Sequence, residues 1–360
     1  MNIKITNSTR VDIERFESAK KTADYIISNH DSNGAYSVDE SWGPEGEIYR
    51  AMCIIVLVDI YILTEKKEYI DTARNILNRF KSTQLRSGGW TISLGRGGLR
   101  FKISEAERID SNSQEDPVIT GAVLKSIVDY SMATGSSEFA LMGERAYQHL
   151  IDIWDDDIGT VNENKNNDLT SLRSNPDAYH FLIMQGINSW HIFGSKDAGI
   201  KFDKILSFVR KTFEEFTDET MPLMIGYHVA ILAKYGTASY RNDIIKPKLE
   251  SYLEADLFAS NKIIGGYGHR DGLRGIVTDE LHMRSAIGLA YAMKSYDYFS
   301  MDDYFTKKTI YKNIVNWIDS MKDDVKGYYE FQDSKDAAKY GKGSPGQYLP
   351  ILWILGTTLK

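Results

Sequence analysis

The chain has 360 residues, of which 42% are hydrophobic and 26% charged, and its formal net charge is −7. This composition is ordinary for a globular protein, and an acidic chain without a basic stripe is not expected to bind nucleic acid. The single cysteine, Cys53, excludes a disulfide framework and a cysteine-based zinc cluster. No apolar run is long enough to span a bilayer and the first residues lack the apolar core of a signal peptide, so we expect a cytoplasmic protein.

Hydrophobic periodicity predicts helices of two kinds, which alternate along the chain. An amphipathic helix faces water on one side, whereas a helix that is apolar all round is buried. The amphipathic, outer helices are expected at 11–29, 66–83, 137–154, 198–216, 240–257 and 303–321. The apolar, inner helices are expected at 45–64, 116–134, 177–193, 221–235, 279–297 and 345–359. Strand patterns are almost absent, so the six pairs predict an all-α fold, an (α/α)6 toroid that takes up residues 1–360 as one domain.

The connections between the helices indicate where the toroid opens. Inner helices are followed by glycines at 135, 194 and 236, where a chain commonly leaves a helix. Long insertions at 91–115, 160–176, 258–278 and 328–344 join outer helices to the inner helices that follow them. These insertions are therefore expected on one face, around the mouth of a central cavity at the beginnings of the inner helices.

A short pattern recurs at the ends of outer helices. Its cleanest copies are 25–36 and 150–161, a third runs from Phe80 through Gln84-x3-Gly88-x-Trp90, and a fourth lies at 317–329. In this pattern the chain resembles the α/α-toroid superfamily of terpenoid cyclases and protein prenyltransferases, whose Q-x3-G-x-W turns lie between helices and stabilise them. The resemblance implies the fold and not the reaction, because the Asp-x-Asp-Asp acid and the zinc ligands of those enzymes have no counterpart here. The acidic run at 155–157 is expected to be a solvated helix end.

A second resemblance is to six-hairpin carbohydrate enzymes, which include uronate epimerases, polysaccharide lyases and glycosidases. Gly88-Gly89-Trp90, followed by a long loop and Asp116-Pro117, is similar in layout to some of these lyases. The segment 175–180, Asn-Pro-Asp-Ala-Tyr-His, is similar to a Tyr-His turn of glucuronyl epimerases. This resemblance implies a carbohydrate substrate.

The candidate site residues are ionisable or aromatic side chains near the beginnings of the inner helices, where loops converge and backbone N–H groups point outward. The candidate catalytic residues are Asp116, Tyr179, His180, His228, Glu280 and His282. The candidate substrate-binding residues are Trp42, Glu47, Arg50, Tyr227, Tyr267, His269, Arg270 and Arg284.

Several of these candidates have a purely structural alternative. A carboxylate in a first helical turn, such as Asp116, can simply cap the helix. Glu280 and Arg284 are spaced four residues apart, as in a helical ion pair or a clamp for a substrate carboxylate. Tyr227 and His228 are about 100° apart around a helix, so one of them is structural.

The segment 265–272 contains four glycines together with His269, Arg270 and Asp271. It is expected to be either a mobile rim that closes over a ligand or a wide turn. Aromatic residues of the same rim can stack on sugars or surround an isoprenoid cation. For Trp90 and Tyr329 we favour a role in seating the turns.

Three hypotheses for the function follow. The main one is an enzyme that acts on a carbohydrate, possibly containing uronate, by acid/base chemistry, as a lyase, epimerase or hydrolase. The alternatives are a cyclase-like or prenyltransferase-like enzyme with an isoprenoid substrate, and a non-catalytic toroid that binds a glycan or a peptide. No cofactor is predicted, a divalent metal stays open, and the expected partner is a small-molecule or glycan substrate. The ionisable residues at the mouth favour the first hypothesis over a hydrocarbon substrate.

Overall fold

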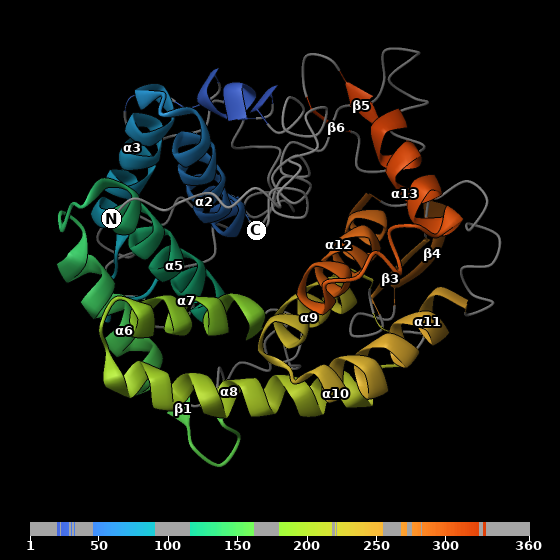
Figure 1. Ribbon diagram of the computed structural model, residues 1–360. Helices are drawn as coiled ribbons and strands as arrows, with labels where there is room; N and C mark the ends of the chain where they lie inside the picture. Colours follow the sequence, from blue (N-terminus) through green and yellow to red (C-terminus); the bar gives the residue numbers. More distant parts are fainter. Residues whose placement is uncertain are drawn as a thin grey trace.

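Helices in two concentric rings form the fold of the computed structural model (Figure 1). The structure describes residues 20–21, 23–28, 30, 32, 46–90, 116–161, 180–217, 220, 222–254, 268–271, 276–281, 283–323 and 327–328. The inner ring contains α2 (Gly46–Thr64), α5 (Pro117–Thr134), α7 (His180–Ile192), α9 (Pro222–Tyr235) and α12 (Met283–Ser300). The outer ring contains α3 (Lys67–Thr83), α6 (Ala140–Asp152), α8 (Lys196–Glu215), α10 (Ala238–Tyr240), the π-helical turn η4 (Arg241–Ile245), α11 (Lys246–Glu254) and α13 (Thr309–Ser320). This arrangement confirms the predicted all-α toroid.

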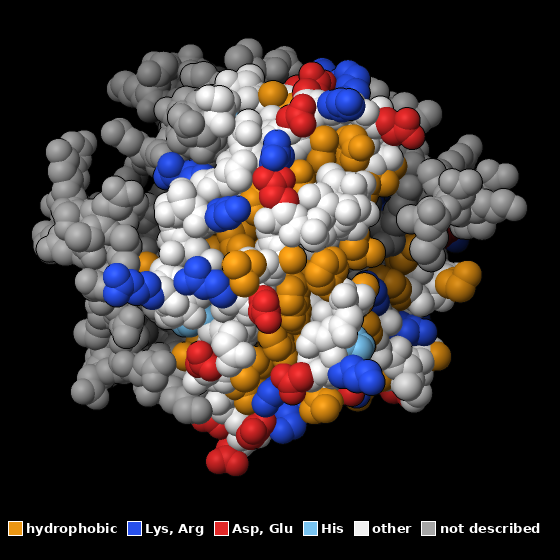
Figure 2. All heavy atoms as spheres, turned by 90° about the vertical axis from the view of Figure 1, so that its left-hand side faces the viewer, with side chains coloured by type: hydrophobic (Ala, Val, Ile, Leu, Met, Phe, Trp, Pro, Cys, Tyr) orange, Lys and Arg blue, Asp and Glu red, His pale blue; other side chains and the backbone are white. Residues whose placement is uncertain are grey.

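The two rings have the burial that their sequence patterns predict. Inner helix α9 buries every residue from Pro222 to Ala233. Outer helix α3 buries only one stripe, which includes Tyr69, Ile76 and Phe80. The side of the molecule that carries α3 and α6 shows Lys, Arg, Asp and Glu side chains spread among hydrophobic ones (Figure 2). The hydrophobic core therefore lies between the rings.

Three short antiparallel hairpins differ from the expected near-absence of strands. They are β1 (Trp154–Asp155) with β2 (Thr160–Val161), β3 (Gly268–Asp271) with β4 (Ile276–Leu281), and β5 (Lys322–Asp323) with β6 (Gly327–Tyr328). In β4 the run Ile276-Val277-Thr278 is β-branched, which favours a strand. The predicted helix start at 279 is therefore wrong, and α12 begins at Met283.

The predicted outer helix 303–321 begins six residues later than expected, because residues 304–307 form turns and α13 starts at Thr309. Residues 20–21 and 23–28 of the first predicted outer helix are helical. The sixth predicted inner helix, 345–359, lies outside the described residues, as do most of the long insertions.

The Gln84-Gly88-Trp90 turn links two outer helices. The Gln84 side-chain amide donates hydrogen bonds to the carbonyls of Gly88, at 2.9 Å, and of Met142 in α6, at 3.0 Å. The Trp90 indole N–H donates to the Phe80 carbonyl at 2.9 Å, and the two rings pack edge to face. These contacts support the structural role that the pattern implies.

Replacing Gln84 by alanine should lower the free energy of unfolding by about 1–2 kcal/mol, because two hydrogen bonds to backbone carbonyls are lost. Urea denaturation measures this change. Gln148→Ala is the matched control: its amide bonds only the exposed Asp152 carboxylate on the same helix, and a change within about 0.5 kcal/mol is expected. Equal effects of the two substitutions would contradict the bridging role of Gln84.

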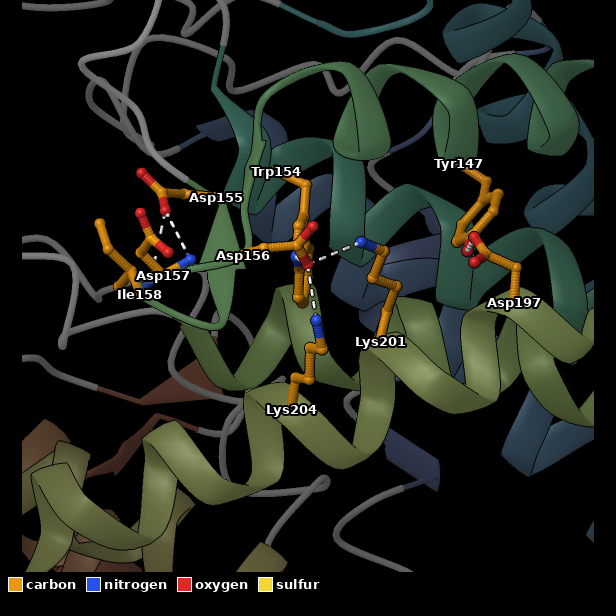
Figure 3. Close-up of polar contacts among 9 residues, drawn as sticks. All are labelled: Tyr147, Trp154, Asp155, Asp156, Asp157, Ile158, Asp197, Lys201 and Lys204. Atoms are coloured by element: carbon orange, nitrogen blue, oxygen red, sulfur yellow. Dashed lines mark hydrogen bonds and ion pairs between the residues drawn. The ribbon is translucent and has the colours of Figure 1, made fainter.

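The acidic run at 155–157 lies in the β1–β2 hairpin, which projects beyond outer helix α8 (Figure 1), and its polar contacts are drawn in Figure 3. Asp156 accepts hydrogen bonds from Lys204 at 2.8 Å, Lys201 at 3.2 Å and the Trp154 indole at 2.9 Å. The two lysine partners hold the pKa of Asp156 below its usual range. Asp156 of this run thus attaches the hairpin to α8 through its two lysine partners.

Neighbouring inner helices approach each other at glycines. A Cβ atom on Gly121 of α5 would lie 2.6 Å from the Ile183 Cα of α7. A Cβ atom on Gly288 of α12 would lie 2.5 Å from the Leu223 Cα of α9. Each of these four residues lies in the first two turns of its helix. Within each pair the helices therefore run parallel, with their beginnings on the same face.

Candidate functional site

The beginning of α2 carries a guanidinium–carboxylate pair. The Nη1 atom of Arg50 lies 3.1 Å from both carboxylate oxygens of Glu47. The Arg50 side chain is only 4% exposed and that of Glu47 is 18% exposed. The structure thus brings together two predicted substrate-binding residues, as a fixed charged pair that can hold a hydroxyl group. One turn further on, burial raises the pKa of the Cys53 thiol, so this cysteine is inert.

Asp116 caps inner helix α5. One of its carboxylate oxygens accepts the backbone N–H of Val118 at 2.8 Å, and its own N–H donates to the Trp90 carbonyl at 2.8 Å. The residue is 2% exposed. The capping alternative is therefore observed, and the cap also connects α5 to the Gln84-Gly88-Trp90 turn.

Tyr227 and His228 face different neighbours, as their spacing requires. The Tyr227 ring packs edge to face on Tyr291 of the adjacent inner helix α12, with the centroids 5.9 Å apart. His228 is 1% exposed, its ring lies 4.6 Å from that of Phe216, and Phe216 follows outer helix α8. His228 Nδ1 donates to the Met224 carbonyl at 2.9 Å, and burial lowers the pKa of His228 to about 4. His228 therefore belongs to the core between the rings, and we leave it out of the catalytic set proposed below.

Four other candidates are placed by their backbone only. His180 is the first residue of α7, and Arg284 is the second residue of α12. His269 and Arg270 lie in β3, opposite Thr278 and Val277 of β4.

Glu280 corrects one expectation. It lies in β4 and not in α12, so it cannot form a helical i, i+4 pair with Arg284. The cause is again the β-branched segment that extends the strand. Trp42, Tyr179, Tyr267 and His282 lie outside the described residues.

Tyr291 is a residue of the inner ring that the candidate set missed. It lies in the third turn of α12, is 8% exposed and contacts Tyr227, and burial raises the pKa of its hydroxyl. The available signal was a tyrosine within the apolar stretch 286–293 of this helix. Tyr291 was missed because the candidates came from the first two turns of the inner helices.

The described residues contain no cluster of three or more His, Cys, Asp or Glu side chains that could hold a metal ion. None of the helices in this part of the chain combines the length and the apolar character needed to cross a membrane.

No family model and no curated protein sequence matches the chain. Solved structures do match its fold. A D-mannose isomerase is 14% identical, with a TM-score of 0.69, over 97% of this chain and 96% of that one. The cellobiose 2-epimerase of Spirochaeta thermophila is 10% identical, with a TM-score of 0.68, over 98% of both chains. An α-1,6-mannanase of a Salegentibacter species is 8% identical, with a TM-score of 0.58, over 96% of this chain and 98% of that one. These likenesses show the α/α-toroid fold.

Proposed function

We propose that this protein is an enzyme that isomerises or epimerises a sugar at the beginnings of the inner helices. The observation that carries the proposal is the likeness to a mannose isomerase and a cellobiose 2-epimerase over nearly the whole of each chain. The mannanase likeness has the same extent but a lower TM-score. Both likenesses support the main sequence hypothesis of a carbohydrate enzyme that uses acid/base chemistry, and we choose from it the reactions that need only proton transfer on one sugar.

The chemistry needs few groups. A base removes the proton on C2 of the open-chain aldose, the electron pair forms the C1=C2 double bond, and the former carbonyl oxygen on C1 takes up a proton to give the enediol. A proton returned to C1, with loss of the O2 proton, gives the ketose, and a proton returned to the other face of C2, with loss of the O1 proton, gives the epimer. Substrate and product are isomers, so no co-substrate is consumed. Histidine suits such transfers because its pKa lies close to neutral pH.

The proposed roles follow from position. His180 begins α7 and His282 directly precedes α12, so we assign them the proton transfers. The Glu47–Arg50 pair, at the beginning of α2, is assigned to hold sugar hydroxyl groups. Glu280, in β4 just before α12, would orient a histidine or a hydroxyl group.

The test is incubation with D-mannose, cellobiose and an α-1,6-linked mannobiose in D2O, followed by NMR. Formation of the ketose or the C2 epimer, with deuterium at the carbon that receives the proton, is expected. Release of monosaccharide from a disaccharide without any isomer would replace the proposal by a hydrolase. If none of the three sugars reacts, the proposal fails for this substrate class.

For a sugar that the wild-type protein converts, His180→Asn should lower kcat by about a hundredfold, as expected for loss of a general acid or base. The control is His191→Asn, the same substitution at an exposed position in the last turn of the same helix. Equal activity of the two variants would remove His180 from the proposed mechanism.

A further inference from the structure

A cavity of about 340 Å³ lies at the opposite end of the inner ring from the proposed active site. Its walls come from α5, α9 and α12 from their third turns onward, beginning at Lys125, Ala230 and Tyr291, and from α7 from Met184 in its second turn onward. Since paired inner helices run parallel, most of this lining lies toward the face where the helices end. The volume is at the lower end of the range for small-molecule sites.

One part of the lining is apolar and aromatic. Tyr291 and Phe299 of α12 contribute rings, and Phe202 of outer helix α8 contributes another. At the rim, Met132 is 65% exposed and Ile192 is 59% exposed. Exposed apolar side chains around a cavity favour binding of a ligand with an apolar ring system, because binding removes apolar surface from water.

The other part of the lining is polar and ordered. The Asn188 side-chain amide donates to the Tyr235 hydroxyl at 2.6 Å, which joins α7 to α9. The Lys125 ammonium lies 2.7 Å from the Asp129 carboxylate, one turn further along α5. These contacts fix the positions of the groups that a ligand would meet.

The charge of the lining is positive. Three lysines, Lys125, Lys234 and Lys294, face one lining carboxylate, Asp129, and Asp59 of α2 adds a more distant negative charge. Burial alone would lower the pKa of Lys125, but Asp129 and Asp59 raise it above its usual value, so the ammonium stays charged.

Lysines near helix ends also have a structural explanation, because they complement the helix dipole. That explanation covers Lys234, which lies in the last turn of α9. It does not cover Lys125 or Lys294, since each lies more than one turn before the end of its helix. Lys125 has its own partner in Asp129, and the lining as a whole still holds three lysines and one carboxylate, which gives it a net positive charge.

We propose that this cavity is a second binding site, for a small organic anion with a flat apolar body, such as an aromatic carboxylate. The lysine ammonium groups would bind the carboxylate of the ligand, and the rings of Tyr291 and Phe299 would pack on its aromatic ring system. The proposal does not depend on the sugar chemistry of the opposite face.

The probe is 2-naphthoate, with the neutral 2-naphthamide as its isostere, and binding is measured by calorimetry. We expect 2-naphthoate to bind at least about tenfold more tightly than the amide, because only the anion gains charge-assisted contacts. Equal affinities for the two compounds, or no binding of 2-naphthoate, would overturn the proposal.

Two variants locate the site. Lys234→Glu should weaken 2-naphthoate at least about tenfold, whereas Lys211→Glu, the same charge change at an exposed position of α8 outside the cavity, should leave it unchanged. Ala230→Trp fills the cavity and should abolish binding, with the thermal midpoint showing that the variant is folded. Equal weakening by the two lysine variants, or full binding by Ala230→Trp, would place the anion elsewhere and contradict the inference.

Discussion

Replacing Gly288 by alanine should lower the free energy of unfolding by about 3 kcal/mol. The new Cβ atom would lie 2.4 Å from the Pro222 carbonyl oxygen and 2.5 Å from the Leu223 Cα. Both are backbone atoms of α9, which cannot rotate away as a side chain does. The two helices must therefore move apart, and the packing between them is lost along their length. The better helix propensity of alanine returns only about 0.5–1 kcal/mol.

Gly199→Ala is the control for this prediction. Its Cβ atom would lie 2.8 Å from ring atoms of His191, an exposed side chain that can turn away at the cost of one exposed hydrogen bond, to the Ser195 carbonyl. The substitution should be neutral or slightly stabilising in the same denaturation experiment. A Gly288→Ala protein as stable as the wild type would show that α9 and α12 do not pack as closely as the structure has them.

The second large effect is an acid sensitivity that arises from His228. Burial lowers the pKa of His228 to about 4, against an ordinary value of 6.5 in the unfolded chain. Below pH 6.5 the unfolded state binds a proton that the folded state does not accept until about pH 4. The stability is therefore complete above this range and falls as the pH falls through it. The loss amounts to about 2 kcal/mol at pH 5 and about 3 kcal/mol at pH 4.

Urea denaturation at pH 7 and pH 5 tests this effect, because few carboxylates titrate in that interval. His228→Asn keeps a donor for the Met224 carbonyl and has no group that titrates there. The variant should be less stable at both pH values but should lose about 2 kcal/mol less than the wild type between them. His191→Asn, the same substitution at an exposed position, is the matched control. The same pH dependence in wild type and His228→Asn would rule out His228 as the cause.

The alternation of the helices could be predicted from the sequence because it follows from local periodicity. The sequence alone is enough to distinguish a helix that is buried on every side, such as α9, from an amphipathic helix, such as α3. The beginning of α12 was only partly visible in the sequence: the β-branched run 276–278 favours a strand, but pairing with β3 extends that strand to Leu281.

The candidate site was harder to predict. The spacing of Tyr227 and His228 showed that they diverge, but only the packing of Phe216 against His228 shows which one faces the outer ring. Gly121 and Gly288 were visible as glycines inside helices, yet their partners depend on tertiary contacts. The cavity beside Tyr291 depends on how far the inner helices separate, and no local pattern records that distance.

The glycine contacts have a mechanical consequence. Gly121 meets Gly186 and Gly226 meets Gly288, so α5 with α7, and α9 with α12, each form a nearly incompressible unit. Within the described part of the chain, α7 and α9 touch at few points. If the inner ring widens or narrows, we therefore expect the movement at the seam, that is, at the boundary between α7 and α9 where the two units meet. The cavity has walls from both units, so a molecule bound there would act as a wedge on that seam.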